Sequence, residues 1–195
     1  MAALSEDPLQ LFREWFEEAG RAGVTAPEAM TLATATVDGA PSARMVLLKG
    51  ADADGFVFFT GYGSRKGGEL AENPRAALVL YWQPLGKQIR IEGPVERLSE
   101  QDSAGYFARR PRGSQLAAWA SQQSRPLANR GELEARYAEL ERQYEGKDVP
   151  LPPHWGGFRL RPEAIEFWQH RDNRLHDRVR YTRARADWNI DLISP

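Results

Sequence analysis

Apolar residues recur at helical spacing near the start of the chain, at Leu9, Leu11, Phe12, Trp15, Phe16 and Ala19. Asp7 stands directly before Pro8. An aspartate followed by a proline is a typical helix N-cap and first helical residue. The pattern therefore predicts an amphipathic helix over residues 7–20 that ends near Gly20.

Alternating apolar and polar positions then predict a series of strands joined by short turns. Asp38-Gly39 is the strongest hairpin signal in the chain. A glycine turn at residues 61–63 leads into a short helix that Ser64 begins and Asn73-Pro74 ends, and a second turn lies at residues 84–86. The expected strands of this part cover residues 31–37, 42–49, 56–60, 76–82 and 88–98.

The pattern becomes helical after residue 98. Ser99 is a candidate N-cap, Pro111 ends the first of these helices, and the last one carries opposite charges four residues apart. Leu151-Pro152-Pro153 predicts a rigid extended linker, after which strand patterning returns. The expected helices cover residues 99–109, 114–122 and 130–144, and the later strands cover 158–160, 164–169, 176–182 and 188–192.

The order of these elements predicts the fold class. About six to nine strands follow one another in hairpin order, without sustained alternation of strand and helix, which favours an antiparallel β-barrel with peripheral helices, an α+β fold. No internal repeat, low-complexity tract or domain boundary is visible. We therefore expect one domain over residues 1–195, with an N-terminal helix (7–20), a helical insertion (99–145) and C-terminal strands (155–195).

Composition narrows the class of protein. The 195 residues are 42% hydrophobic and 27% charged, with a net charge of -1, which is typical of a globular protein and argues against a nucleic-acid-coating polycation. The absence of cysteine excludes disulfides, zinc–thiolate sites and a cysteine nucleophile. The three histidines lack metal-ligand spacing, so we expect no metal site. The N-terminus has neither signal-peptide features nor a membrane-length apolar run, and we expect a cytoplasmic protein.

Two basic segments are candidate anion sites. Gly61–Lys66 lies between a strand and a helix, where backbone N–H groups and the helix dipole favour an anion and Arg65 and Lys66 add two cations. It is neither a Walker A loop nor a dinucleotide fingerprint. Arg44 and Lys49 bracket an apolar run and lie on opposite faces of a strand unless a bulge intervenes. An ordinary glycine turn and a core strand with charged ends are the simpler alternatives.

A third candidate combines a phenol, a guanidinium and a hydroxyl. Tyr106 and Arg110 stand four apart on one face of the expected helix, and Ser114 can cap the next helix. Such a set can bind a phosphate, although a helix corner with a capping serine is equally compatible. Polar residues 123–125 follow and could contact a ligand.

The least ordinary segment lies near the C-terminus, after Trp168. Arg174, His176 and Arg178 alternate, so on a strand they would share one face. Three neighbouring cationic groups repel one another unless an anion or an acidic partner compensates. This segment is therefore a candidate site.

Taken together and in this order, these segments resemble the pyridoxine/pyridoxamine 5′-phosphate oxidase family, from about Asp7 to Pro195. The resemblance rests on RMVLLK (44–49), FTGYGSRK (59–66), KQIRIEG (87–93), YFARRPRGSQLAAW (106–119), SQQS (121–124), WGGFRL (155–160), IEFWQ (165–169) and RLHDR (174–178). It implies an antiparallel FMN-binding split barrel that acts as a homodimer with two flavin sites at the subunit interface. It also implies oxidation of pyridoxamine or pyridoxine 5′-phosphate to pyridoxal 5′-phosphate, with O₂ as acceptor and H₂O₂ as product.

The resemblance also assigns residues. FMN would be bound by Arg44, Met45, Val46, Leu47, Leu48, Lys49, Phe59, Thr60, Arg65, Lys66, Gln123 and Ser124, with Gln88, Trp168 and Arg178 reaching the flavin largely from the partner chain. The substrate phosphate would be held by Lys49, Tyr106, Arg110 and Ser114. Arg174 and His176 would lie over the substrate ring as the catalytic pair, orienting the substrate and tuning its protonation.

FMN and the substrate each carry a phosphate, so the site needs two separate anion-binding groups. The sequence offers two: the helix start with Arg65 and Lys66, and the corner formed by Tyr106, Arg110 and Ser114 with Lys49. The chain departs from the family at residues 169–173, which are more polar than the expected glycine-containing stretch. Only six residues precede Asp7, whereas the family often has a basic N-terminal arm there. We therefore expect the contacts of that arm to be missing or supplied otherwise. Two alternatives stay open. One is a related flavoprotein oxidase of a secondary-metabolite pathway, and the other is a non-catalytic protein that binds FMN or pyridoxal phosphate.

Overall fold

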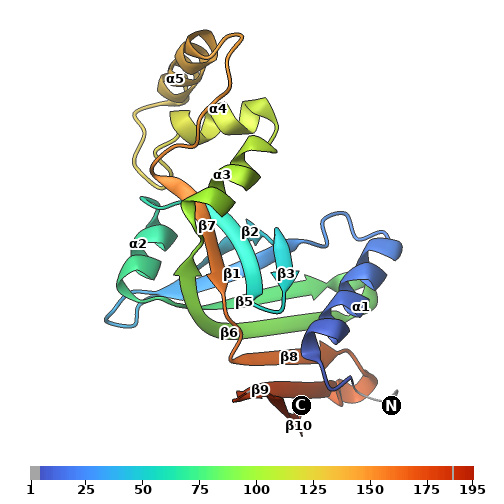
Figure 1. Ribbon diagram of the computed structural model, residues 1–195. Coiled ribbons are helices and arrows are strands. Elements are labelled where there is room, and N and C mark those ends of the chain that lie inside the picture. Colours follow the sequence, from blue (N-terminus) through green and yellow to red (C-terminus); the bar gives the residue numbers. More distant parts are fainter. Residues whose placement is uncertain (1–4, 186) are drawn as a thin grey trace.

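The computed structural model describes residues 5–185 and 187–195, and these residues form a ten-stranded antiparallel sheet with five α-helices around it (Figure 1). The first four residues, part of the segment tested for a signal peptide, lie outside the described residues. The helices are α1 (Pro8–Arg21), α2 (Arg65–Glu72), α3 (Glu100–Ala108), α4 (Arg112–Ala120) and α5 (Arg130–Gln143), with short 3₁₀ helices η1 (Gln83–Leu85) and η2 (Asp172–Arg174). The strands are β1 (Ala29–Ala35), β2 (Pro41–Leu47), β3 (Gly50–Asp52), β4 (Gly55–Gly61), β5 (Arg75–Trp82), β6 (Lys87–Arg97), β7 (Trp155–Leu160), β8 (Ala164–Gln169), β9 (Asp177–Ala184) and β10 (Asp187–Leu192).

The long strand β6 joins the two parts of the sheet. Its first half pairs with β8, in register Ile91 to Ile165, and its last residues pair with β7, in register Val95 to Leu160. Strand β7 then pairs with β4, while the order on the other side is β10-β9-β8-β6-β5-β1-β2. The sheet therefore curls into the predicted antiparallel split barrel, and the fold class is confirmed.

The core forms where inward-facing residues of neighbouring strands meet in register. One row crosses five strands through Leu32, Leu78, Ile91, Ile165 and Tyr181, and each of these side chains is 0% exposed. Such a row removes large apolar areas from water and stabilises the sheet at about 25 cal/mol per Å² buried.

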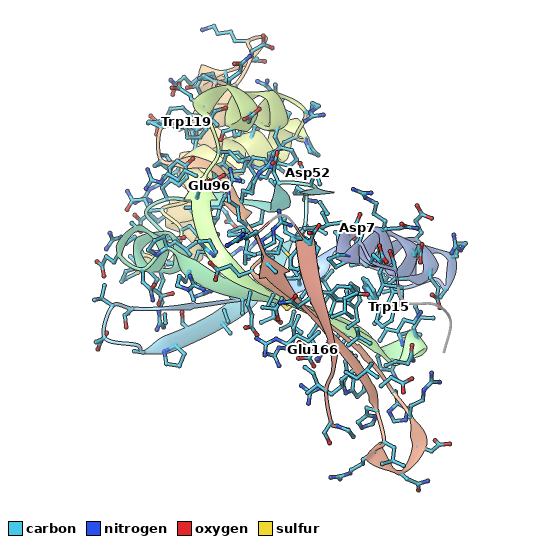
Figure 2. All side chains as sticks on the ribbon, turned by 60° about the horizontal axis from the view of Figure 1, so that its bottom comes forward. Asp7, Trp15, Asp52, Glu96, Trp119 and Glu166 are labelled. Atoms are coloured by element: carbon cyan, nitrogen blue, oxygen red, sulfur yellow. The ribbon has the colours of Figure 1, made fainter. Side chains whose placement is uncertain are left out.

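Helix α1 closes one side of this core. Phe12 meets Phe56 edge-to-face at 5.0 Å between ring centroids, and Trp15 meets Phe167 at 5.2 Å. Helices α3, α4 and α5 gather beyond the end of β7 instead (Figure 1). Figure 2 shows Trp119 of α4 well separated from Glu166 of β8, so α4 lies away from that part of the sheet.

Three predicted helix N-caps are present. The Asp7 carboxylate accepts from the Leu9 amide at 2.9 Å, Ser64 Oγ accepts from the Gly67 amide at 3.3 Å, and Ser99 Oγ accepts from the Asp102 amide at 3.0 Å. These caps confirm the predicted starts of α1, α2 and α3. The hairpin at residues 38–39 is also confirmed, since β1 and β2 pair directly on either side of it.

Several predicted details were wrong. Strand β1 lies two residues earlier than predicted, β7 begins at residue 155 instead of 158, and β3 was not predicted. Strand β2 ends at Leu47, two residues early, because Leu48 turns into the core and the Lys49 amide donates to the Val57 carbonyl instead. Helix α4 begins at residue 112, two residues before the predicted start. Arg174 belongs to η2 with a left-handed φ of 61°, and β9 begins only at residue 177. Of the three alternating cationic residues, only Arg178 therefore lies on a strand, and they do not share a strand face.

No helix in the described part of the chain is long and apolar enough to cross a membrane.

Candidate active site

A cavity of about 570 Å³ lies where β2, β4 and the start of α2 face the corner between α3 and α4. Predicted site residues make up most of its lining: Arg44, Met45, Val46, Leu47, Lys49, Phe59, Thr60, Lys66, Tyr106, Arg110, Ser114 and Gln123. Residues far apart in the sequence therefore meet at one place. Arg109, Pro111 and Trp155 also line the cavity and were not predicted.

Strand β2 ends the strand order of its sheet, and its residues of both parities, Arg44 and Met45 among them, line the cavity together with Lys49. Arg44 points inward from the strand, as alternation requires. Regular alternation would point the Lys49 side chain to the opposite face of the strand from Arg44. Lys49 follows the end of β2, however, so its direction is not fixed by this alternation. The sequence left open an interruption of the strand between Arg44 and Lys49, and the structure has one at Leu48-Lys49, where the strand ends.

The first anion site surrounds the side-chain amine of Lys66, a residue that is 6% exposed. We use the name Lys66 site for Lys66 together with Arg44, Thr60, Ser64, Arg65 and Glu69. Lys66 Nζ donates to Thr60 Oγ1 at 3.1 Å and to Ser64 Oγ at 3.2 Å. Among the described residues it makes no ion pair with a carboxylate within 4.0 Å. Burial lowers the pKa of Lys66, and the nearby Arg44 lowers it further, while Glu69 raises it. A buried ammonium held only by hydroxyls is a strong anion-binding group.

Close packing of the backbone positions this amine. A Cβ at Gly67 would lie 2.2 Å from the Tyr62 carbonyl oxygen, so only glycine lets the first turn of α2 approach the preceding loop. The Ser64 hydroxyl caps the same turn. The site thus combines a helix N-terminus with a fixed cation.

Glu69 was missed by the sequence analysis. Its residue is 5% exposed, yet it ion-pairs with Arg44 (3.2 Å) and with Arg65 (2.9 Å). Burial alone would raise the pKa of Glu69, but hydrogen bonds from Ser42, Thr34, Arg65 and Arg44 lower it to about 2. Its spacing of four from Arg65 on a helix was a visible signal, whereas its contact with Arg44 depends on tertiary structure.

The second anion site surrounds the guanidinium of Arg110; we call Lys49, Tyr106, Arg110 and Ser114 the Arg110 site. Helix α3 ends at residue 108, so Tyr106 and Arg110 do not share a helical face as predicted, but both side chains still line the cavity. Ser114 is the third residue of α4 rather than its cap, and it lines the cavity as well.

The guanidinium of Arg110 contains an unsatisfied buried donor. Its Nη1 is buried without a hydrogen-bond partner, and no acidic residue of the described chain pairs with it. The guanidinium carbon lies 4.6 Å from the Trp155 ring centroid, and burial lowers the pKa of Arg110. Beside it, Tyr106 stacks on Phe59 at 3.9 Å, and burial raises the pKa of Tyr106, which keeps the phenol neutral. A buried guanidinium donor of this kind fits an anionic ligand.

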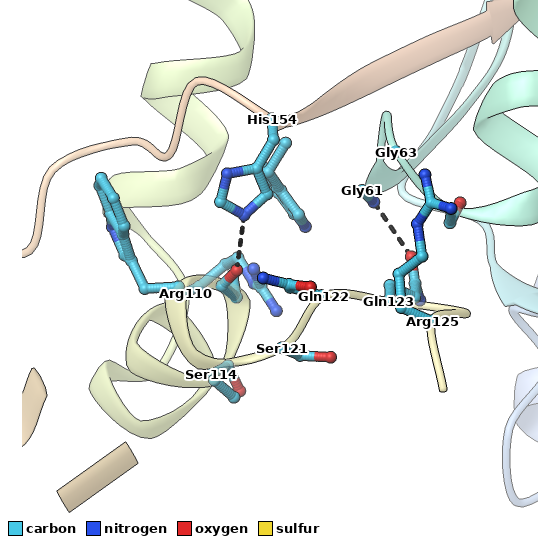
Figure 3. A pocket seen from close by; sticks show the side chains of 14 residues that line it. Gly61, Gly63, Arg110, Ser114, Ser121, Gln122, Gln123, Arg125 and His154 are labelled. Carbon is cyan, nitrogen blue, oxygen red and sulfur yellow. Dashed lines mark hydrogen bonds between the residues drawn. The ribbon is translucent and has the colours of Figure 1, made fainter. Parts of the chain in front are cut away.

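Gln123 ties the loop after α4 to β4. Its Oε1 accepts from Thr60 Oγ1 at 2.8 Å and from the Gly61 amide at 3.1 Å, the second of which is drawn in Figure 3. Gln123, Arg110 and Ser114 also line an adjoining cavity of about 510 Å³ (Figure 3).

The remaining predicted residues lie elsewhere. Gln88, Trp168 and Arg178 stand in one register row across β6, β8 and β9. Arg178 Nε donates to Glu166 at 2.8 Å, and the His176 ring lies 4.6 Å from Trp168 with Nδ1 accepting from the Arg171 amide. Those that do not line the cavity are Leu48 in the core, Arg65 and Ser124 at the surface, Gln88, Trp168 and Arg178 on β6, β8 and β9, and Arg174 and His176 in the segment before β9.

The geometry fits phosphorylated ligands. The buried amine of Lys66 and the half-buried guanidinium of Arg110 line one cavity without an acidic partner within 4.0 Å among the described residues, each among hydroxyl donors, and aromatic rings lie between the strands and α3. Phosphate binding needs this combination of cation and directed donors.

Comparison with known proteins matches the chain to the models and members of one protein family. Residues 16–144 match the family profile "Pyridoxamine 5′-phosphate oxidase", and residues 155–195 match "Pyridoxine 5′-phosphate oxidase C-terminal dimerisation region". A pyridoxine/pyridoxamine 5′-phosphate oxidase of Rubrobacter xylanophilus is 60% identical over 97% of this chain and 87% of its own length. One from Cupriavidus metallidurans is 54% identical over 100% of this chain and 94% of its own length.

Two solved structures are also similar. PhzG from Burkholderia lata, in complex with tetrahydrophenazine-1-carboxylic acid, superposes with a TM-score of 0.94 at 37% identity, covering 99% of this chain and 95% of that one. An FMN-binding protein of Nostoc punctiforme has a TM-score of 0.78 at 19% identity, covering 98% of this chain and 100% of that one, and supports the fold alone.

Proposed function

The chain belongs to the pyridoxamine 5′-phosphate oxidase family, whose cofactor is FMN, and we propose that it oxidises pyridoxamine 5′-phosphate and pyridoxine 5′-phosphate to pyridoxal 5′-phosphate, with O₂ as acceptor and H₂O₂ as product. The observation that carries this proposal is the unpartnered, buried Nη1 of Arg110, in a cavity that already contains a separate cation at Lys66. One anion site serves the cofactor, and the other serves a phosphorylated substrate.

In this proposal the Lys66 site holds the FMN phosphate. The Lys66 amine and the first turn of α2 supply the charge and the directed donors, and Gln123 holds the loop beside the chain of the cofactor. FMN, when bound, accepts the hydride that leaves the substrate carbon.

The Arg110 site holds the substrate phosphate. The guanidinium packs over the Trp155 ring, and Lys49, Tyr106 and Ser114 can donate to the remaining phosphate oxygens. Fixing the phosphate positions the reacting carbon, which is the main contribution these residues make to the rate.

The residues of β6, β8 and β9 complete the site from a second copy of the chain. The outer face of the sheet exposes large apolar side chains, among them Met45 (62%), Leu47 (44%) and Tyr81 (54%). Exposed apolar patches of this kind are typical of association surfaces, and the C-terminal match is to a dimerisation region. In the homodimer we propose, Gln88, Trp168 and Arg178 contact the flavin and residues 1–195 act as one FMN-binding split-barrel domain.

Arg174 and His176 are proposed to orient the substrate ring and tune its protonation. His176 Nδ1 accepts from the Arg171 amide at 3.1 Å, which leaves Nε2 as the atom that faces a ligand. An Arg174→Ala variant with near-normal kcat/KM would remove that role.

Anaerobic mixing tests the proposed reaction. The protein is purified without added cofactor and loaded with FMN if needed, and pyridoxamine 5′-phosphate is added without O₂. Loss of flavin absorbance, followed by H₂O₂ release when O₂ is admitted, is the expected result. Tight binding without loss of absorbance would instead identify a non-catalytic binding protein.

A second candidate function follows from the likeness to PhzG, which was solved with a tetrahydrophenazine carboxylic acid. A carboxylate could also satisfy Arg110, so an oxidase of reduced phenazine carboxylic acids is the alternative. Identity to the phosphate oxidases is higher, 60% against 37%. Flavin reduction by a reduced phenazine carboxylic acid but not by pyridoxamine 5′-phosphate would favour the alternative.

A further inference from the structure

Glu69 is a buried carboxylate inside a site that is proposed to bind an anion. It accepts hydrogen bonds from Thr34 of β1 and from Ser42 of β2, the latter at 2.6 Å, and it ion-pairs with Arg44 and Arg65. A negative charge in this place opposes a phosphate, so its presence needs a physical reason.

The hydrogen bonds that Arg44 donates show what the negative charge of Glu69 does. Nη1 donates to the Leu32 carbonyl at 3.2 Å and to Thr34 Oγ1 at 2.5 Å, while Nη2 donates to Ser42 and to Glu69. Four of the five N–H groups of a guanidinium are thus already bound to the protein. Arg44 therefore acts on a ligand mainly through its charge, and Glu69 holds it in place.

The charges of the Lys66 site can be added. Arg44, Arg65 and Lys66 supply three positive charges, and Glu69 supplies one negative charge, with a pKa of about 2 that keeps it ionised at neutral pH. The sum is two positive charges, close to the negative charge of a phosphate monoester at pH 7, which is about 1.5 to 2.

We propose that Glu69 is the internal counter-ion of the Lys66 site: it stabilises the cofactor-free protein by compensating Arg44 and Arg65, and it lowers the affinity for FMN by repelling the phosphate. This inference rests on the proposed position of the FMN phosphate at Lys66. The physical basis is that a largely buried cation such as Arg44 destabilises a fold when it has no counter-charge, while a nearby like charge weakens binding of an anion.

The test is Glu69→Gln, which removes the charge and keeps the shape. Two quantities are measured: the melting temperature of the cofactor-free protein, and the Kd of FMN from quenching of flavin fluorescence at low salt. We expect the melting temperature to fall and FMN binding to tighten by about 3- to 30-fold, an effect that shrinks as salt screens the site. A purely structural role would lower both stability and affinity, so the opposite signs are the diagnostic result.

Three controls are available. Glu163→Gln changes the net charge equally at an exposed ion pair with Arg75 and should leave the Kd of FMN unchanged. Riboflavin, which lacks the phosphate, should bind Glu69→Gln no more tightly than the unaltered protein. Glu69→Asp keeps the charge with a shorter reach and should lose stability without gaining affinity for FMN.

Each other outcome either supports or overturns a defined part of the proposal. Weaker or unchanged FMN binding by folded Glu69→Gln refutes the counter-ion role. If Glu69→Gln folds only when FMN is supplied, the phosphate has become the required counter-ion and the proposal is supported; failure to fold even with FMN overturns it. Lys66→Met should lose FMN affinity, and if it does not, the proposed phosphate position is wrong rather than the role of Glu69.

Discussion

Replacing Arg110 by methionine separates recognition of the substrate phosphate from stability of the fold. Nη1 of Arg110 makes no hydrogen bond in the described structure, so the change breaks no internal bond at that atom. Methionine keeps an unbranched side chain over the Trp155 ring but loses the charge and its cation–π contact, which is worth about 0.5–2 kcal/mol. Relief of the buried charge offsets part of this loss, and we expect unfolding free energy to change by only about 1 kcal/mol.

The effect on the phosphorylated substrate should be larger. A hydrogen bond to a charged group contributes about 1.5–3 kcal/mol, which corresponds to about a 10- to 150-fold loss of kcat/KM for pyridoxamine 5′-phosphate. Pyridoxamine without the phosphate cannot use the interaction, so its kcat/KM should change by less than about threefold. The ratio of the two kcat/KM values, from H₂O₂ release with FMN occupancy checked by absorbance, is the measured quantity.

Arg109→Met is the matched control. Arg109 lines the same cavity, but it is exposed and its Nε already donates to the Gly105 carbonyl at 3.1 Å. We expect it to leave the ratio within about threefold of the unaltered protein, as for most exposed charges. Equal losses for both substrates in Arg110→Met, or no loss for either, would refute the assignment of Arg110 to the substrate phosphate.

Three further predictions follow from the same cavity. Gly67→Ala places a Cβ 2.2 Å from the Tyr62 carbonyl oxygen, and should lower the melting temperature by an amount equivalent to about 1–3 kcal/mol and weaken FMN retention during purification. Gln123→Ala leaves the Thr60 hydroxyl without its acceptor and should raise the Kd of FMN about 5- to 10-fold, measured by fluorescence quenching. The pKa of Glu69 is lowered in the folded state to about 2, so its contribution to stability is present above about pH 4.5 and is lost as the pH falls toward 2. Urea midpoints across this pH range should therefore fall less steeply for cofactor-free Glu69→Gln than for the unaltered protein.

Features that depend on neighbours in the sequence could be predicted well. The caps at Asp7, Ser64 and Ser99 and the hairpin at residues 38–39 need only a few adjacent residues, because a cap or a tight turn is satisfied within one turn of chain. The alternation of apolar positions likewise identified nine of the ten strands, since the two faces of a pleated strand differ in burial, whereas β3, with three residues, is too short to show alternation. The family resemblance then grouped residues that spacing alone left as separate hypotheses.

Interactions between distant segments were decided by the tertiary structure. The sequence does not reveal that Glu69 meets Arg44, that Trp155 lies under Arg110, or that Leu48 enters the core and frees Lys49 from strand alternation. The left-handed conformation of Arg174 is equally invisible in a pattern that alternates regularly. Periodicity reports only which face of an element is apolar, whereas the partner of a buried charge depends on how the sheet curls and where each strand ends.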